Sequence, residues 1–256
     1  MRGYRARRSA LAPLLAALAA MVMASPAQAA VLIGEANDPV PAATGTVRLM
    51  AVGDTFLAFN IGRRIVKEGP QVPFARVADT FAEADLVIAN LECALSRNGA
   101  PWPGKQLHFG APPAAAQALA VGGIDAVSLA NNHTLDYSRT AFLETLDALD
   151  ANGVGHAGGG IDATSARAPL ILERNGLRVA LLSYVIGFSG PYHFSTRAWE
   201  ARADRSGVAI ARVSDITADV RAARGVADVV VVAVHGDGEF RPRPKTSMRR
   251  MSAAAV

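Results

Sequence analysis

The chain has 256 residues, of which 51% are hydrophobic and 19% are charged, with a formal net charge of +4. Its single cysteine, Cys93, excludes an internal disulfide. Arg2, Arg5, Arg7 and Arg8 account for the excess positive charge, so the remainder is close to neutral and gives no basic patch for nucleic-acid binding.

The N-terminus has the order of a secretory signal peptide. A basic start precedes the apolar run Leu11–Met23, and an Ala-x-Ala cleavage signal ends at Ala29. The apolar run has about a dozen residues, whereas a membrane-spanning helix needs roughly 20. We therefore expect residues 1–29 to be removed and the protein to be periplasmic, extracellular or on the cell surface. The alternative is a retained N-terminal anchor.

Residues 30–45 look like a flexible leader, and residues 46–256 have a length that suits one α/β domain. No later segment is long and apolar enough to cross a membrane, so no transmembrane helix is expected in the mature chain.

Five runs of Val, Ile, Leu and Ala predict strands, and such continuous runs are typical of strands buried on both faces. These runs are Val47–Val52, Leu86–Ala89, Ala126–Ala130, Val179–Leu182 and Val229–Val234. Apolar spacing and stop signals predict the helices Phe59–Lys67, Val72–Ala84, Pro112–Leu119, Thr140–Ala151 and one from Ser214 or Asp215 to Arg224. A hairpin is expected around Arg174-Asn175-Gly176. Alternating strands and helices predict a doubly wound or layered α/β fold.

Four of the five strands run directly into polar clusters. The clusters are Gly53-Asp54, Asn90-Leu91-Glu92, Asn131-Asn132-His133 with Asp136, and His235-Gly236-Asp237-Gly238-Glu239. In an α/β sheet, ligands bind beyond the carboxyl ends of the strands. The four clusters are therefore expected to form one site.

Carboxylates, an amide oxygen and an imidazole are suited to divalent ions such as Mn, Fe, Zn or Mg. The expected metal ligands are Asp54, Glu92, Asn132 and His235. A carboxylate shared by two ions would allow a two-metal centre for phosphoryl displacement. His133 is expected to face the substrate and donate a proton to the leaving oxygen, with Asp136 orienting its ring.

Each residue also has a structural alternative. Asp54 and Asn132 could cap the helices that follow them, and His133 could be a hydrogen-bonded core histidine. Cys93 is expected to be a buried hydrophobe and not a nucleophile. His156, in the glycine-rich segment 153–160, is expected to be structural.

In their order and approximate spacing, the four strand-end motifs resemble the CapA family of capsule-synthesis proteins linked to poly-γ-glutamate. The fold of that family is similar to that of the calcineurin-like metallophosphatases. The glycine-rich segment 155–169 fits the same pattern, and the resemblance covers about residues 46–256. It implies a four-layer α/β/β/α sandwich with metal ligands on loops after the strands.

Carried over by position, the resemblance makes Asp54, Glu92, Asn132 and His235 the ligands and His133 the acid. Whether Asn90 or Glu92 points inward stays open. The histidine that such phosphatases place two residues after the aspartate is replaced by Phe56. The family continues from its His-Gly-x-Gly-Glu segment to a Gly-His-x-Pro-His motif, so we expect a chain ending at Val256 to be C-terminally truncated, with an incomplete sandwich.

The resemblance implies an exported component of capsule or poly-γ-glutamate synthesis, with a hydrolytic site for a phosphoester or an anionic polymer. Its expected partners are a membrane-bound polymer synthase and poly-γ-glutamate, and no nucleic acid. The alternatives are a component that binds polymer or synthase without catalysis, and an inactive truncated product.

Overall fold

The structure is a computed structural model, and it describes residues 45–189, 194–236 and 242–256. The expected signal peptide 1–29, nearly all of the leader and the motif residues Asp237–Glu239 lie outside the described residues. None of the helices in the described part has both the length and the apolar composition that a bilayer-spanning helix requires.

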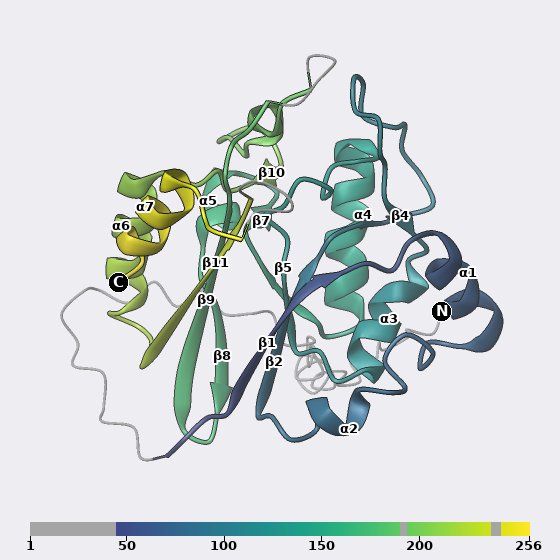
Figure 1. The fold of residues 1–256 in the computed structure, drawn as a ribbon, viewed down its shortest axis with the longest axis horizontal. Helices are drawn as coiled ribbons and strands as arrows, with labels where there is room; N and C mark the ends of the chain where they lie inside the picture. Colours follow the sequence, from purple (N-terminus) through teal and green to yellow (C-terminus); the bar gives the residue numbers. More distant parts are fainter. Residues whose placement is uncertain (1–44, 190–193, 237–241) are drawn as a thin grey trace, which may run out of the picture. The chain divides into compact units, whose positions relative to one another are not determined.

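The described chain alternates between strands and helices, as expected for an α/β protein (Figure 1). The helices are α1 Phe59–Glu68, α2 Ala78–Phe81, α3 Ala114–Val121, α4 Ser138–Ala151, α5 Ala163–Arg167, α6 Val213–Ala223 and α7 Thr246–Ala254, with a 3-10 helix η1 at Thr196–Trp199. The strands are β1 Leu49–Thr55, β2 Leu86–Leu91, β3 Ala94–Leu95, β4 Gly110–Ala111, β5 Ala126–Ser128, β6 Gly155–Ala157, β7 Gly159–Gly160, β8 Leu170–Arg174, β9 Leu177–Val185, β10 Gly207–Val208 and β11 Val229–His235.

Two sheets carry the architecture. The first has the order β1-β2-β5-β6 with parallel neighbours, and the second has the order β11-β9-β8. In the second sheet β11 runs parallel to β9, whereas β8 and β9 form the predicted antiparallel hairpin. Its turn residues Asn175 and Gly176 both have positive φ, 54° and 77°, as a type I′ hairpin turn requires. The predicted α/β class is confirmed.

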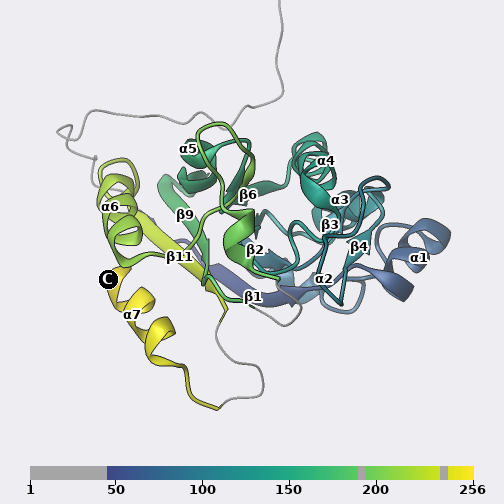
Figure 2. The same cartoon turned by 90° about the horizontal axis from the view of Figure 1, so that it is seen from above.

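Successive residues of the central strands belong to different apolar clusters, because their side chains alternate between the two faces of the sheet. On β2, Val87, Ala89 and Leu91 pack with residues of α1, α3 and α4, whereas Ile88 joins a cluster shared with Leu181 of β9. On β9, the even-numbered residues 180–184 pack with α6 instead. The two sheets therefore share a cluster, and helices cover the other face of each; Figure 2 shows α6 and α7 beside β11, and α3 and α4 beyond β2.

Two expectations about these elements are wrong. The segment predicted as a helix over Val72–Ala84 is a series of turns with only the single helical turn α2, because one apolar pair four residues apart, Val77 and Phe81, specifies no more than one turn. The strands β1 and β11 are not buried on both faces: most of their residues are half-buried or exposed, and each lies at an edge of its sheet among the described strands.

Gly158 marks a close approach between the two sheets. Its φ is +85°, and a Cβ placed there would lie 2.6 Å from Ser183 Cβ on β9 and 2.7 Å from Ala130 Cβ. We expect Gly158→Ala to lower the free energy of unfolding by about 2–4 kcal/mol through backbone strain and overpacking together. Chemical denaturation measures this change.

Gly153 offers the matched control, because it also has a positive φ, +67°, but no heavy atom lies within 4 Å of the position that a Cβ would take there. Gly153→Ala carries only the backbone strain, about 1 kcal/mol. Equal losses in the two variants would show that the approach of the sheets at Gly158 is not tight.

Candidate metal centre

The candidate site lies at one end of the apolar cluster that the two sheets share. On β11, Val231 and Ala233 pack into the cluster shared by the sheets, and His235 continues their row. On β2, Asn90 continues the row of Ile88, and Glu92 follows immediately after the strand. Because side chains alternate along a strand, these polar residues are directed from the two sheets toward one another.

A β-bulge brings Asp54 into the same region. Ala51 of β1 pairs with Ile88, but the next matched residues are Asp54 and Asn90, so β1 has one more residue than β2 over this stretch. Without the extra residue, the strict alternation of β1 would turn Asp54 to the opposite face of the sheet. The bulge at residues 52–53 thus aligns Asp54 with Asn90.

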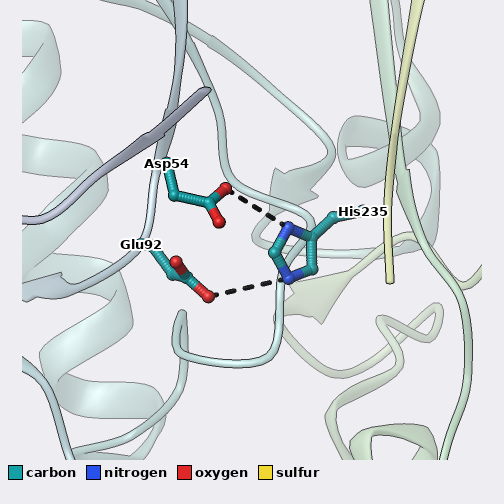
Figure 3. A group of neighbouring side chains, drawn as sticks. All are labelled: Asp54, Glu92 and His235. Atoms are coloured by element: carbon teal, nitrogen blue, oxygen red, sulfur yellow. Dashed lines mark ion pairs between the residues drawn. The ribbon is translucent and has the colours of Figure 1, made fainter. Parts of the chain in front are cut away.

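Three side chains form a cluster with the composition of a metal site. One ligand atom each of Asp54, Glu92 and His235 lies within 4.8 Å of the others. His235 Nδ1 is 3.7 Å from Asp54 Oδ1, and its Nε2 is 3.7 Å from Glu92 Oε1 (Figure 3). The imidazole therefore lies between two carboxylates that come from the other sheet.

The two neighbouring asparagines have different surroundings. Asn132 accepts a hydrogen bond of 2.6 Å from His235 Nε2 through its Oδ1, so it joins the cluster. Asn131 is fully buried, donates to Leu91 O at 2.7 Å, and accepts from the His133 amide at 2.9 Å. The structure thus brings together all four predicted ligands. Asn131 instead connects the loop that contains His133 to the end of β2 through its two hydrogen bonds.

Asn90 and Glu92, between which the sequence does not choose, both reach the site. Asn90 Nδ2 donates to Asp54 Oδ1 at 2.7 Å and lies 3.2 Å from His235 Nδ1. Asn90 Oδ1 accepts from Asn131 Nδ2 at 3.1 Å, which fixes the orientation of the amide. Asn90 is therefore an additional site residue, and its place in the Asn-Leu-Glu motif was the signal for it.

The electrostatics of the cluster favour a bound cation. Burial, followed by the negative charge of Asp54, raises the pKa of Glu92 to about 7. Burial lowers the pKa of His235, against the opposing effect of Asp54, so its neutral, metal-binding form is favoured. Two crowded carboxylates beside a neutral imidazole and an amide oxygen fit a hard or borderline divalent ion.

His133 is held by a buried charged pair next to this cluster. Its Nδ1 is 2.7 Å from Asp136 Oδ2, the contact that the sequence predicts, and 2.8 Å from Lys105 Nζ. Lys105 also forms an ion pair with Asp136, and the Phe109 amide donates to Asp136 at 2.6 Å. The His133 ring stacks on Phe109 with centroids 3.7 Å apart. Lys105 was missed because its loop has no periodic pattern.

The helix-capping alternative is wrong for both candidate residues. The N-cap of α1 is Ala58 and that of α4 is Tyr137, so neither Asp54 nor Asn132 caps a helix. Cys93 is buried, and burial raises its pKa to about 12, which confirms its interpretation as a small hydrophobe.

Comparison with known proteins identifies the family. Residues 48–256 match the model of the bacterial capsule synthesis protein PGA_cap. The chain belongs to the PGA_cap family. The predicted resemblance to CapA proteins is thereby confirmed.

Curated relatives carry related names. The match to the capsule biosynthesis protein CapA of Bacillus anthracis is 23% identical and covers 80% of this chain and 50% of the relative. A probable polyglutamine synthesis accessory protein of Mycobacterium tuberculosis is 29% identical over 59% of this chain and 41% of its own length. The uncharacterized protein y4sH of Sinorhizobium fredii is 32% identical over 55% of this chain and 31% of its own.

This PGA_cap chain therefore spans between about a third and a half of the length of these relatives. Among solved structures, a hypothetical protein from Thermus thermophilus is 18% identical, with coverage of 78% of this chain and 72% of that one. Its TM-score of 0.36 is too low to support a comparison of folds.

Proposed function

We propose that this protein is an exported component of capsule or poly-γ-glutamate synthesis whose strand-end site binds divalent cations. Its two sheets with outer helices form a four-layer α/β/β/α arrangement of the metallophosphatase type. The single observation that carries the proposal is the convergence of Asp54, Glu92 and His235 from the ends of strands in two different sheets. The names of the relatives supply the polymer class.

In this proposal Asp54, Glu92, Asn132 and His235 hold the metal, whose chemistry is to polarise a phosphoester or carbonyl oxygen and to activate water. Asn90 orients Asp54 through the 2.7 Å hydrogen bond. His133, fixed between Asp136 and Phe109, presents its remaining ring nitrogen for proton transfer. The class of reaction is hydrolysis of a phosphoester or of an anionic polymer.

A non-catalytic role is the second candidate, because one observation disfavours His133 as a general acid. Its Nδ1 lies 2.8 Å from the Lys105 ammonium, and burial, with a smaller contribution from that charge, lowers the pKa of His133 against the opposing effect of Asp136. The neutral ring can donate to Asp136 or accept from Lys105, but it cannot do both through one nitrogen. In this alternative the site binds metal and holds polymer or a membrane synthase without turnover.

The test combines metal binding with turnover. We expect the EDTA-treated chain to bind Mn²⁺ or Zn²⁺ in calorimetry. His235→Ala should weaken this binding by more than about 100-fold, because replacing a residue that only orients a metal ligand already lowers metal affinity by about 10–100-fold. Hydrolysis of bis(p-nitrophenyl) phosphate by the metal-loaded protein, lost in His133→Ala with metal retained, supports the enzyme. Metal binding without hydrolysis supports the binding role.

His156→Ala is the matched control. Like His235, His156 lies on a strand, β6 of the first sheet, but it contacts Asp150 at 3.2 Å instead of the cluster. Its metal affinity should equal that of the wild type. If His235→Ala binds metal as well as His156→Ala does, the proposed site is wrong.

A further inference from the structure

Three arginines gather around the short helix η1, next to the candidate site. Arg139, at the start of α4, donates from Nη2 to Ala198 O at 2.9 Å. Arg205 donates from Nη2 to Glu200 O at 3.4 Å, and its backbone pairs with that of Arg202 through hydrogen bonds of 2.8 and 3.1 Å. We call Arg139, Arg202 and Arg205 the arginine cluster.

Several exposed arginines of the described chain have no ion pair, but Arg139 and Arg205 of the arginine cluster are half-buried and have none either. Ion pairs within 4.0 Å in the described chain join Arg64 to Glu68, Arg167 to Asp215 and Asp219, Arg174 to Asp125, Arg178 to Asp228, and Arg212 to Glu200 and Asp215. None of the three cluster arginines has such a pair among the described residues. Burial, and then the charges of Arg205 and Arg202, lower the pKa of Arg139. Their positive charges therefore have no carboxylate within ion-pair distance in this part of the chain.

Three buried hydrogen-bond donors in the same place have no acceptor. Arg139 Nη1, Arg205 Nε and the indole Nε1 of Trp199 are each buried without a hydrogen-bond partner among the described residues. All three belong to side chains at or beside residues 198–200, and Trp199 itself is fully buried. Buried donors in proteins are nearly always paired, and leaving a charged donor unpaired is especially costly. Oxygen atoms of an anion would satisfy these donors and offset the charge.

Two tryptophans and Lys105 connect the arginine cluster with His133. Arg139 lies over the ring of Trp102 at 5.9 Å, and Trp102 contacts Trp199 edge to face at 5.5 Å. On the other side, Lys105 Nζ is 5.6 Å from the Trp199 ring centre and 2.8 Å from His133 Nδ1. The two places are therefore linked through the packed rings of Trp102 and Trp199. Arg202 is exposed, which opens the cluster to solvent.

We propose that the arginine cluster is an anion-binding subsite that takes a carboxylate or phosphate group of a substrate extending from the candidate metal centre. That the anion belongs to the substrate rests on the proposed function. That the cluster binds an oxyanion does not, because no cluster residue is a metal ligand.

Tryptophan fluorescence tests the proposal directly. The chain has two tryptophans. Trp102 lies under Arg139, and Trp199 contacts Trp102. The EDTA-treated full chain is titrated with glutarate and, separately, with inorganic phosphate, with sodium chloride holding the ionic strength constant. We expect a saturable change in emission for at least one of the two anions. The anion that saturates identifies the preferred group.

Variants separate a specific site from general screening. We expect Arg139→Gln and Arg205→Gln each to weaken the saturable binding by about tenfold, the loss of one hydrogen bond to a charged group. Arg202→Gln, at an exposed position that cannot disturb the packing, should weaken it as well. Arg64→Gln, which changes the arginine of the exposed pair with Glu68 on α1, should leave it unchanged.

The subsite proposal is overturned if neither anion gives a saturable change. It is also overturned if the binding is unchanged in all three cluster variants. His235→Ala distinguishes this failure from that of the proposed function: it should lose metal and keep the anion-dependent emission change. If the metal centre fails while the anion titration saturates, the subsite stands without the hydrolytic role.

Discussion

Asp136→Asn is expected to lower the free energy of unfolding at pH 7 by about 3–5 kcal/mol, because it leaves the buried Lys105 ammonium without its charge partner. The Lys105 side chain is 8% exposed and that of Asp136 is 0% exposed. Asparagine keeps an acceptor for the Phe109 amide, so the variant removes charge while the backbone contact can persist. Urea denaturation measures the loss as a lower midpoint.

The double variant Lys105→Met/Asp136→Asn isolates the cause. Removing the unpaired Lys105 charge should recover most of the lost free energy of unfolding, because apolar replacement of a buried ion pair is often neutral for stability. Glu68→Gln is the control in the exposed Arg64–Glu68 pair and should cost less than about 1 kcal/mol. If Asp136→Asn lowers the free energy of unfolding no more than Glu68→Gln does, the Lys105 ammonium is solvated in the variant and the explanation is wrong.

Glu92→Gln is expected to have two opposite effects, losing metal affinity by more than about 100-fold while stabilising the metal-free protein at pH 8. Burial and Asp54 raise the pKa of Glu92 to about 7. Between its ordinary pKa and about 7 the folded state keeps a proton that the unfolded state has released, so stability falls as the pH rises through this window. Glutamine cannot ionise and avoids this cost.

Thermal melts of the EDTA-treated proteins test the predicted direction of the pH dependence of stability. The stability of Glu92→Gln relative to the wild type should grow from pH 5 to pH 8 by about 1–2 kcal/mol, a value reduced for partial solvent access. Glu173→Gln, on the exposed end of β8, is the control and should show no such growth. A difference that stays constant with pH would mean that Glu92 ionises normally beside Asp54.

The sequence predicted the strands best, because strands of a layered α/β fold are long apolar runs that few other elements produce. The runs of β2 and β11 were located for the same reason, although β2 ends two residues and β11 one residue later than predicted, and Glu92 and His235 were found with them. The helix expected over Val72–Ala84 is wrong because it depended on a single apolar pair, Val77 and Phe81, which spans only the one turn that the structure forms.

The remainder of the site depends on contacts that the sequence does not encode locally. The bulge that aligns Asp54 with Asn90 has Gly53 as its only cue, and a glycine near the end of a strand is equally common in an ordinary turn. Lys105 reaches His133 from a loop without periodicity. The arginine cluster combines α4 with a segment about 60 residues later, and its lack of carboxylate partners is visible only in three dimensions.

The position of His235 opposite Asp54 has a consequence for folding. A cation held by both residues would close a loop of roughly 180 residues, the kind of link for which chain-entropy arguments give large stabilisation. It would also act as a cross-link between the two sheets, so that their separation and metal occupancy depend on each other. Hydrogen exchange at the ends of β1 and β11 should then slow in step when metal is added, although the two strands share no hydrogen bonds in the described sheets.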